Sequence, residues 1–258
     1  MAKLEFPFID GVLEFDVTDP PFRVYHDTRK EVVWKLIRGV EYLHIGAVDG
    51  HIAEFGTASG LTASALCYAL GESEKIYRQV DQWHGIGVRN VYLFDSFEGL
   101  PEIRSDVDKA SPHVVAGVWG KGGCYVLDAP SLRSVCEQYL PADRIRIFSG
   151  WFEDTLPTLD PEVRFGLVHL DCDLYESTLQ ALDFLLANGR LSDGCALFFD
   201  DWNSNRASPR LGQRRAWREC VEKYGLVYDD GGEYAGTSRK FILHLENDPR
   251  VPVKNARV

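Results

Sequence analysis

The sequence predicts an α/β fold in which a mainly parallel sheet is covered by helices on both faces. Short apolar segments alternate with longer amphipathic segments from residue 51 onward, and a strand–turn–strand pair closes the chain. Alternation of this kind makes neighbouring strands parallel, because each connection crosses back through a helix. The closing pair predicts one antiparallel strand. We therefore expect seven strands in one mainly parallel sheet.

The predicted elements follow from the period of the apolar residues. The first 27 residues hold aromatic residues and prolines without a clear period, which indicates an irregular arm. Thr28 and Glu31 form a capping-box pattern ahead of an apolar helical stripe, which predicts a helix that ends near residue 45. The predicted strands are 51–56, 90–95, 144–150, 166–171, 195–201, 225–230 and 240–245, and the predicted helices between them are 61–70, 177–186 and 212–224.

The chain of 258 residues is expected to form one domain, 1–258, because it holds neither an internal repeat nor a low-complexity linker. Two segments stand apart from the alternation of strands and helices. Residues 1–45, the arm and the first helix, are expected to act as a lid. Residues 101–135 are rich in glycine and indicate an insertion or mobile loop.

The composition excludes several classes of protein. Twenty-eight Lys and Arg against 39 Asp and Glu give a net charge of −11, which disfavours a nucleic-acid or anionic-membrane surface. No apolar run approaches the roughly 20 residues of a membrane span, and the N-terminus shows no apolar secretory segment. The six cysteines are scattered and form no CxxC pair, so neither a disulfide framework nor a zinc site is indicated. We expect a cytoplasmic protein with reduced thiols.

A glycine-rich turn lies between the first predicted strand and the helix that follows it. Glu54, Gly56 and Gly60 give the pattern E-x-G-x-A-x-G, in which glycines allow a sharp turn and the close approach of a ligand. The spacing differs from the dinucleotide pattern G-x-G-x-x-G, and the Glu54 carboxylate would repel a pyrophosphate. It suits a cationic or hydroxyl-bearing ligand, and Asp95, which ends the next strand, is placed to accept both hydroxyls of a ribose. An ordinary strand–helix turn is the alternative.

Two pairs of carboxylates follow apolar strands: Asp171 and Asp173 follow one, and Asp200 and Asp201 follow the next. Open α/β sheets bind ligands at the carboxyl ends of parallel strands, so we expect these side chains to converge. Four such carboxylates repel one another unless protons or a cation neutralise them, and oxygen ligands select Mg²⁺, Mn²⁺ or Ca²⁺. Helix capping or solvation is the alternative for each single residue. His169, on the same strand face as Asp171, is either a base or a core histidine.

Five motifs occur in order along the chain: EFGTASG at 54–60, LFDSFEGLP at 93–101, SGWFEDTLP at 149–157, HLDCDLYEST at 169–178 and FFDDW at 198–202. Together they resemble the macrocin-O-methyltransferase (TylF-like) family of S-adenosylmethionine- and metal-dependent sugar O-methyltransferases. The resemblance covers about residues 50–225. It implies the Rossmann-like class I methyltransferase fold, a seven-stranded, mostly parallel sheet with an antiparallel last strand and helices on both faces.

The resemblance also implies roles for particular residues. S-adenosylmethionine would be bound by Glu54, Gly56, Thr57, Gly60, Asp95, Ser96, Ser149, Gly150 and Trp151. A metal ion, Mg²⁺ or Mn²⁺, would be bound by Asp171, Asp200 and Asp201. Asp173 matches the family's proposed general base, and the metal-bound Asp171 is the other candidate for that role.

The implied function is methylation of a sugar hydroxyl in a glycosylated natural product of the antibiotic type, by a dimer or larger homo-oligomer. Such a displacement needs an in-line oxygen whose pKa a metal lowers, and a carboxylate that takes its proton. A metal-dependent glycosyltransferase is an alternative, because many glycosyltransferases use a D-x-D motif after an apolar strand to hold a metal ion on the diphosphate of a nucleotide sugar. A nicotinamide-dependent oxidoreductase fits less well, since the glycine spacing fails. The non-enzyme alternative is a catalytically inactive, methyltransferase-like binding subunit, and the intact carboxylates count against it.

Overall fold

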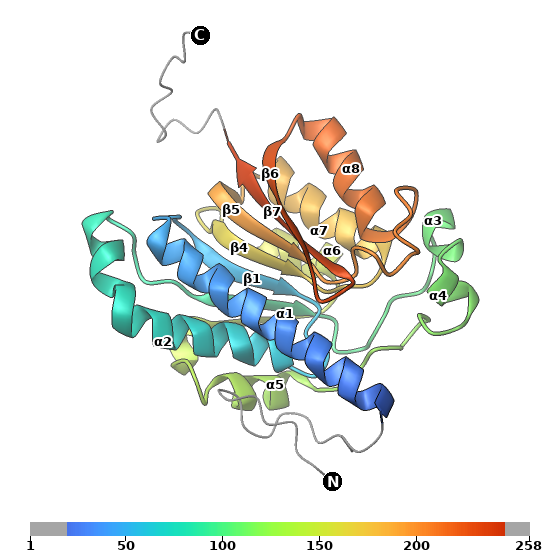
Figure 1. Cartoon of the computed structure of the whole chain (residues 1–258), viewed down its shortest axis with the longest axis horizontal. Coiled ribbons are helices and arrows are strands. Elements are labelled where there is room, and N and C mark those ends of the chain that lie inside the picture. The colour runs from blue at the N-terminus through green and yellow to red at the C-terminus, as the bar shows by residue number, and fades with distance from the viewer. Residues whose placement is uncertain (1–19, 246–258) are drawn as a thin grey trace.

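The computed structural model describes residues 20–245, which form a seven-stranded sheet flanked by helices (Figure 1). The strands are β1 (His51–Phe55), β2 (Val91–Asp95), β3 (Ile145–Ser149), β4 (Phe165–Leu170), β5 (Leu191–Phe199), β6 (Val227–Tyr234) and β7 (Ser238–His244). Their order across the sheet is β3-β2-β1-β4-β5-β7-β6. Each of them overlaps one predicted strand, so the predicted series of strands is confirmed.

The first five strands are parallel, and the order of the sheet reverses at β1. β2 and β3 lie on one side of β1, and β4 and β5 lie on its other side. The last strand, β7, pairs antiparallel with both β5 and β6. The predicted mostly parallel sheet with an antiparallel last strand is therefore confirmed. The ends of β1 and β4 lie at the switch point, where open α/β sheets bind their ligands.

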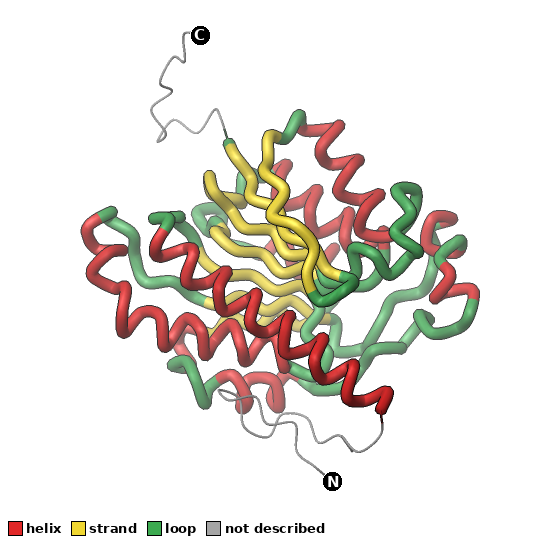
Figure 2. The backbone as a smooth tube through the Cα atoms, viewed as in Figure 1, coloured by secondary structure: helices red, strands yellow, loops and turns green. Residues whose placement is uncertain are grey.

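Helices cover both faces of the sheet, as predicted (Figures 1 and 2). One face carries α1 (Pro20–Ile45), α2 (Leu61–Trp83) and α5 (Ala129–Cys136), and the other carries α6 (Phe152–Thr155), α7 (Tyr175–Ala187) and α8 (Gly212–Tyr224). Two short helices, α3 (Asp106–Lys109) and α4 (Pro112–Val115), lie in the segment after β2. Within residues 20–245, no helix combines the length and the apolarity that crossing a membrane requires.

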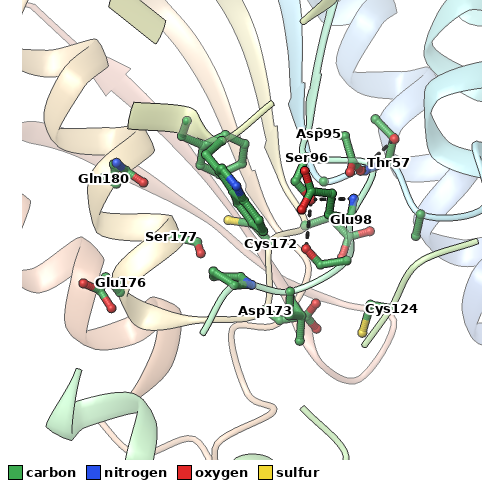
Figure 3. Close-up of a pocket in the computed structure, with 18 of the residues that line it drawn as sticks. Thr57, Asp95, Ser96, Glu98, Cys124, Cys172, Asp173, Glu176, Ser177 and Gln180 are labelled. Carbon is green, nitrogen blue, oxygen red and sulfur yellow. Dashed lines mark hydrogen bonds between the residues drawn. The ribbon is translucent and has the colours of Figure 1, made fainter. Parts of the chain in front are cut away.

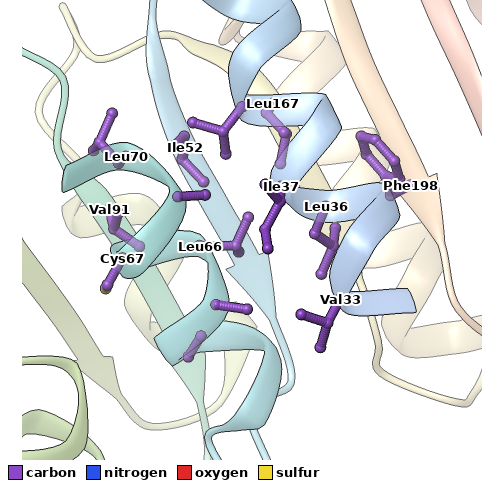
Figure 4. Packing of buried hydrophobic residues seen from close by; sticks show 14 of the residues in the cluster. Val33, Leu36, Ile37, Ile52, Leu66, Cys67, Leu70, Val91, Leu167 and Phe198 are labelled. Carbon is purple, nitrogen blue, oxygen red and sulfur yellow. The ribbon is translucent and has the colours of Figure 1, made fainter. Parts of the chain in front are cut away.

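The packing of α1 against the sheet explains why this helix lies where it does (Figure 4). Val33 and Leu36 of α1 and Leu66 of α2 are buried in one apolar cluster between the two helices and the sheet. Burial of a side chain of this size contributes roughly 1.5–3 kcal/mol. A Cβ at Gly39 would lie 2.6 Å from the ring of Phe198, so glycine is needed for α1 to approach β5 this closely.

The start of α1 corrects the prediction of an irregular arm. The helix begins at Pro20, so residues 20–27 are helical and Thr28 lies inside the helix instead of capping it. Prolines fit the first turn of a helix, because the missing N–H would have no partner there and the ring presets φ. The rest of the predicted arm, residues 1–19, lies outside the described residues. The lid role of residues 1–45 stays a prediction.

The end of α2 also differs, because the helix continues well beyond the predicted 61–70. The prediction stopped before Gly71, but a Cβ at that position would lie 2.6 Å from the carbonyl oxygen of Tyr139. This glycine therefore reflects close packing and not a helix end. The additional turns carry Asp81, whose Oδ2 lies 2.6 Å from Nδ1 of His44, and this buried contact joins α2 to α1.

The segment 101–135 contains α3, α4 and the first turns of α5, and hydrogen bonds attach it to the rest of the fold. Asp108 accepts from the first two backbone N–H groups of α7, at 2.8 and 3.1 Å, and so caps that helix. Ser111 Oγ donates to Asn205 Oδ1 at 2.6 Å. These contacts join the insertion to the segments that follow β4 and β5. Its mobility stays a prediction.

Candidate active site

A cavity of about 890 Å³ opens at the carboxyl ends of the parallel strands (Figure 3). It is lined by the glycine turn after β1, by the segments after β2, β3 and β4, and by side chains of α7 and α8. Eight of the predicted site residues line it: Gly56, Thr57, Asp95, Ser96, Gly150, Trp151, Asp171 and Asp173. The sheet topology therefore brings together residues from four strand ends that are far apart in the sequence.

The other predicted site residues are not among the described residues that line the cavity: Glu54, Gly60, Ser149, Asp200 and Asp201. Gly60 precedes α2 as its N-cap, with a φ of 73°, and Ser149 is the last residue of β3. Asp200 and Asp201 follow β5 and meet Asp171 beside the cavity. The cofactor contacts predicted for Gly60 and Ser149 stay predictions.

Glu54 lies in the interior of the sheet and pairs with a histidine of β4. Its Oε1 is 2.8 Å from Nδ1 of His169, and both side chains are fully buried. Burial lowers the pKa of His169, but the hydrogen bond and the charge of Glu54 outweigh it and raise that pKa above its ordinary value. The structure thus brings Glu54 to His169 and not to the cavity surface. A direct contact between Glu54 and a cofactor stays a prediction.

Gly56 has a structural reason to be glycine. Its φ is +85°, and a Cβ at this position would lie 2.0 Å from the carbonyl oxygen of Asp171. The end of β1 is therefore pressed against the end of β4. The alternative interpretation of the motif, an ordinary strand–helix turn, is therefore enough to explain this glycine. The close contact between Gly56 and the backbone of Asp171 also places the turn beside Asp171.

Replacing Gly56 with alanine is expected to destabilise the fold more than the same change at Gly85. Gly85 also has a positive φ, +71°, but a Cβ there meets nothing within 4 Å in the described structure. Gly85→Ala should cost about 1–2 kcal/mol from backbone strain alone. Gly56→Ala adds steric overlap and should cost about 2–5 kcal/mol. Denaturant unfolding measures both, and equal losses would contradict the close contact.

Asp95 organises the turn that faces the cavity. Its Oδ2 accepts from the backbone N–H of Thr57 at 2.7 Å and from the Thr57 hydroxyl at 2.9 Å (Figure 3). Its Oδ1 accepts from the Phe97 N–H at 2.8 Å. A carboxylate has about four acceptor positions, so about one is left for a ligand. Accepting both ribose hydroxyls, as predicted, would therefore require the Thr57 hydroxyl to turn away.

Asp171, Asp200 and Asp201 meet as a group, here called the carboxylate triad. One oxygen of each lies within 4.8 Å of the others. Burial, and then the charge of the neighbouring carboxylates, raises the pKa of Asp171 and the pKa of Asp201 well above the usual range. Oδ2 of Asp201 is buried and has no hydrogen-bond partner among residues 20–245. Three carboxylates whose oxygens converge, one of which also has an unpartnered oxygen, fit a hard divalent cation.

Asp173 lies outside the triad and lines the cavity. Its φ is +57°, a left-handed conformation that Asp and Asn adopt more readily than other non-glycine residues. Burial, followed by the charge of Asp200, raises the pKa of Asp173 to about 7. A cavity-lining carboxylate of this kind can accept a proton from a ligand.

Sequence reasoning missed several residues beside these carboxylates. Arg29 Nη1 donates to Asp200 Oδ2 at 3.1 Å, and Ser238 Oγ donates to Asp200 Oδ1 at 3.1 Å. Cys124, from the segment 101–135, lies near Asp173 (Figure 3). The residue is exposed, but partial desolvation of its thiol, followed by the charge of Asp173, raises the pKa of that thiol to about 12. No pattern pointed to these residues, because each comes from a segment distant in sequence from the carboxylate it faces.

The family model for macrocin-O-methyltransferase (TylF) matches residues 35–222. The chain is 37% identical over 133 residues to the 8-demethyl-8-(2,3-dimethoxy-alpha-L-rhamnosyl)-tetracenomycin-C 4'-O-methyltransferase of Streptomyces olivaceus, over 51% of this chain and 49% of that protein. It is 32% identical over 119 residues to the mycinamicin III 3''-O-methyltransferase of Micromonospora griseorubida, over 44% of each chain. The chain thus spans about half the length of the curated relatives it matches.

Solved structures share the fold. The O-methyltransferase NovP aligns with a TM-score of 0.62 and 21% identity, over 83% of this chain and 79% of that one. A calicheamicin methyltransferase aligns with a TM-score of 0.64 and 21% identity, over 88% and 83% of the two chains. These similarities confirm the predicted class I methyltransferase fold. Because the family model extends from α1 to α8 and includes the glycine turn and every carboxylate of the triad, the chain belongs to the macrocin-O-methyltransferase (TylF) family.

Proposed function

We propose that the protein is an S-adenosylmethionine-dependent O-methyltransferase that methylates a sugar hydroxyl of a glycosylated natural product and requires Mg²⁺ or Mn²⁺. The observation that carries this proposal is a single cavity lined both by Asp95 with its glycine turn and by Asp171 and Asp173. The names of the relatives, a tetracenomycin 4'-O-methyltransferase and a mycinamicin III 3''-O-methyltransferase, support the reaction and the class of acceptor. The partner is then a small glycosylated molecule, and the protein acts as a homo-oligomer.

The cavity residues fit the proposed cofactor. Asp95 offers a remaining acceptor position for a ribose hydroxyl, and Trp151 offers an aromatic face for a purine ring. The positive φ of Gly56 turns the backbone beside them. When bound, S-adenosylmethionine supplies an electrophilic methyl group, and a divalent ion supplies positive charge beside the acceptor hydroxyl.

The carboxylates have two proposed roles, metal binding and proton acceptance. Asp171, Asp200 and Asp201 would hold the ion, since their oxygens converge and Asp201 has a buried oxygen without a partner in the described structure. Asp173 lines the cavity outside this triad, so it would accept the proton of the acceptor hydroxyl. Asp171 lines the cavity as well and is the alternative base.

Ligand binding separates this proposal from the rival glycosyltransferase. We expect the protein to bind S-adenosylhomocysteine and not UDP-sugars, because the Asp95 carboxylate, which lines the cavity, disfavours a pyrophosphate near the glycine turn. Methyl transfer to a 6-deoxyhexose-bearing acceptor would in addition exclude an inactive binding subunit. Preferential binding of a UDP-sugar would contradict the proposal.

Asp95→Ala is expected to weaken the binding of S-adenosylhomocysteine roughly ten- to a hundredfold, because a hydrogen bond to a charged group is worth about 1.5–3 kcal/mol. Calorimetric titration measures the change. Thr57→Val is the matched comparison, since it removes one donor to Asp95 but keeps the carboxylate, and it should lose less affinity. Parent-like affinity in Asp95→Ala would reject the assignment.

A further inference from the structure

The side chain of Arg29 connects α1 to the carboxylate triad. Its Nη1 donates to Oδ2 of Asp200 at 3.1 Å, and the Asp200 side chain is only 5% exposed. Arg29 also lines the cavity, so its guanidinium lies where α1 borders the proposed site. Water and salt screen a contact with a buried carboxylate less than they screen a surface ion pair. This contact is therefore expected to matter energetically.

Arg29 provides positive charge beside the carboxylate triad. Within the described part of the chain, it is the one cationic side chain in an ion pair with the triad. The other contacts to Asp200 and Asp201 come from neutral hydroxyls, those of Ser238 and Ser204. Without a bound ion, Arg29 is thus a counter-charge that offsets part of the repulsion among these carboxylates.

We propose that Arg29 competes with the divalent cation for Asp200, so that the ion and the guanidinium replace each other as the partner of this carboxylate. The inference rests on the proposed metal site. Any ion held by Asp200 would share that carboxylate with Arg29, and two cations on one buried carboxylate repel each other. Asp200 would therefore bind either cation more weakly in the presence of the other.

The competition couples the ion to the position of α1. Beyond Arg29, the helix is held by its buried apolar residues, such as Val33 and Leu36. Arg29 is the described side chain that ties the start of α1 to the triad. Binding of the ion would release this tie, and by linkage the docking of Arg29 would weaken binding of the ion by the same factor. The N-terminal turns of α1 would thus respond to metal loading.

Calorimetric titration with Mn²⁺ tests the competition directly. Arg29→Gln removes the charge and is expected to bind Mn²⁺ about 5- to 150-fold more tightly than the parent protein, the usual range of coupling between two sites. Arg29→Lys keeps the charge and should bind Mn²⁺ much as the parent does. Arg38→Gln is the matched control, because Arg38 lies on the same helix and pairs with Glu41 at the surface.

Thermal unfolding gives a readout that needs no turnover. In EDTA, Arg29→Gln should unfold at a lower temperature than the parent protein. Addition of Mn²⁺ should raise the unfolding temperature of Arg29→Gln by more than it raises that of the parent. Unchanged or weaker Mn²⁺ binding by Arg29→Gln would overturn the proposed competition. The proposed metal site would still stand in that case if Asp201→Asn abolishes Mn²⁺ binding. If the parent binds no Mn²⁺, the proposed metal dependence fails, and the competition fails with it.

Discussion

Methyl transfer is expected to stop when EDTA removes the divalent cation and to return when excess Mg²⁺ is added. The loss should be about 10³-fold or more, equivalent to about 4 kcal/mol, because a cation beside the reacting oxygen stabilises the transition state by several kcal/mol. The geometry of the triad motivates this expectation, since its three oxygens converge within 4.8 Å. Full activity in the chelator would refute the metal requirement and would leave Asp173, which lines the cavity, as a base that acts without a metal ion.

Asp201→Asn tests the same metal site by removing one of its proposed ligands. It should abolish the response to Mg²⁺, and it should make the protein more heat-stable than the parent in EDTA, because it removes one of three mutually repelling carboxylates. Asp106→Asn is the matched control, since it removes an exposed carboxylate of the insertion, and it should change neither property. An Asp201→Asn variant that still needs Mg²⁺ for full activity would exclude Asp201 as a ligand.

Most of the sheet could be predicted because parallel strands are buried on both faces and appear in the sequence as short apolar runs. β4 is buried along its whole length, and the run GLVHLD predicts it to within a residue at each end. The helix predicted at 212–224 has the same bounds as α8. Strand ends then located the candidate site, because the topology places ligands at the carboxyl ends of the strands.

Helix ends were harder to predict because single glycines and prolines have several structural uses. The predicted helix 61–70 ends just before Gly71, yet α2 continues through this glycine, which packs against the backbone of Tyr139. Pro20 and Pro21 suggested an irregular arm, although prolines are also compatible with the first turn of a helix. Local sequence does not contain the long-range contact or the cap that decides between these uses.

The site itself was predicted in part. The convergence of Asp171, Asp200 and Asp201 followed from strand order, but the orientation of Glu54 did not. Glu54 lies opposite His169 in the pairing of β1 with β4. The sequence of either strand alone does not determine this register. The contact between Arg29 and Asp200 joins residues 171 positions apart, so it emerges only from the packing of α1 on the sheet.

Asp173→Asn is expected to lose roughly 10²–10⁴-fold in kcat, the usual contribution of a positioned base, while keeping its affinity for S-adenosylhomocysteine and for Mn²⁺. Asparagine matches aspartate in shape and tolerates the left-handed φ of +57° at this position, so backbone strain should not confuse the result. Asp173 lies outside the triad, so its replacement leaves all three proposed metal ligands in place. The measurement is kcat with a 6-deoxyhexose-bearing acceptor, alongside calorimetric binding of cofactor product and ion.

Asp171→Asn completes the comparison, because Asp171 both lines the cavity and belongs to the triad. It should raise the concentration of Mg²⁺ needed for activity as well as lower kcat, whereas Asp173→Asn should lower kcat alone. The two variants therefore separate a residue that holds the ion from one that moves the proton. A near-normal kcat for Asp173→Asn, beside an inactive Asp171→Asn at saturating Mg²⁺, would instead identify Asp171, a proposed metal ligand, as the base.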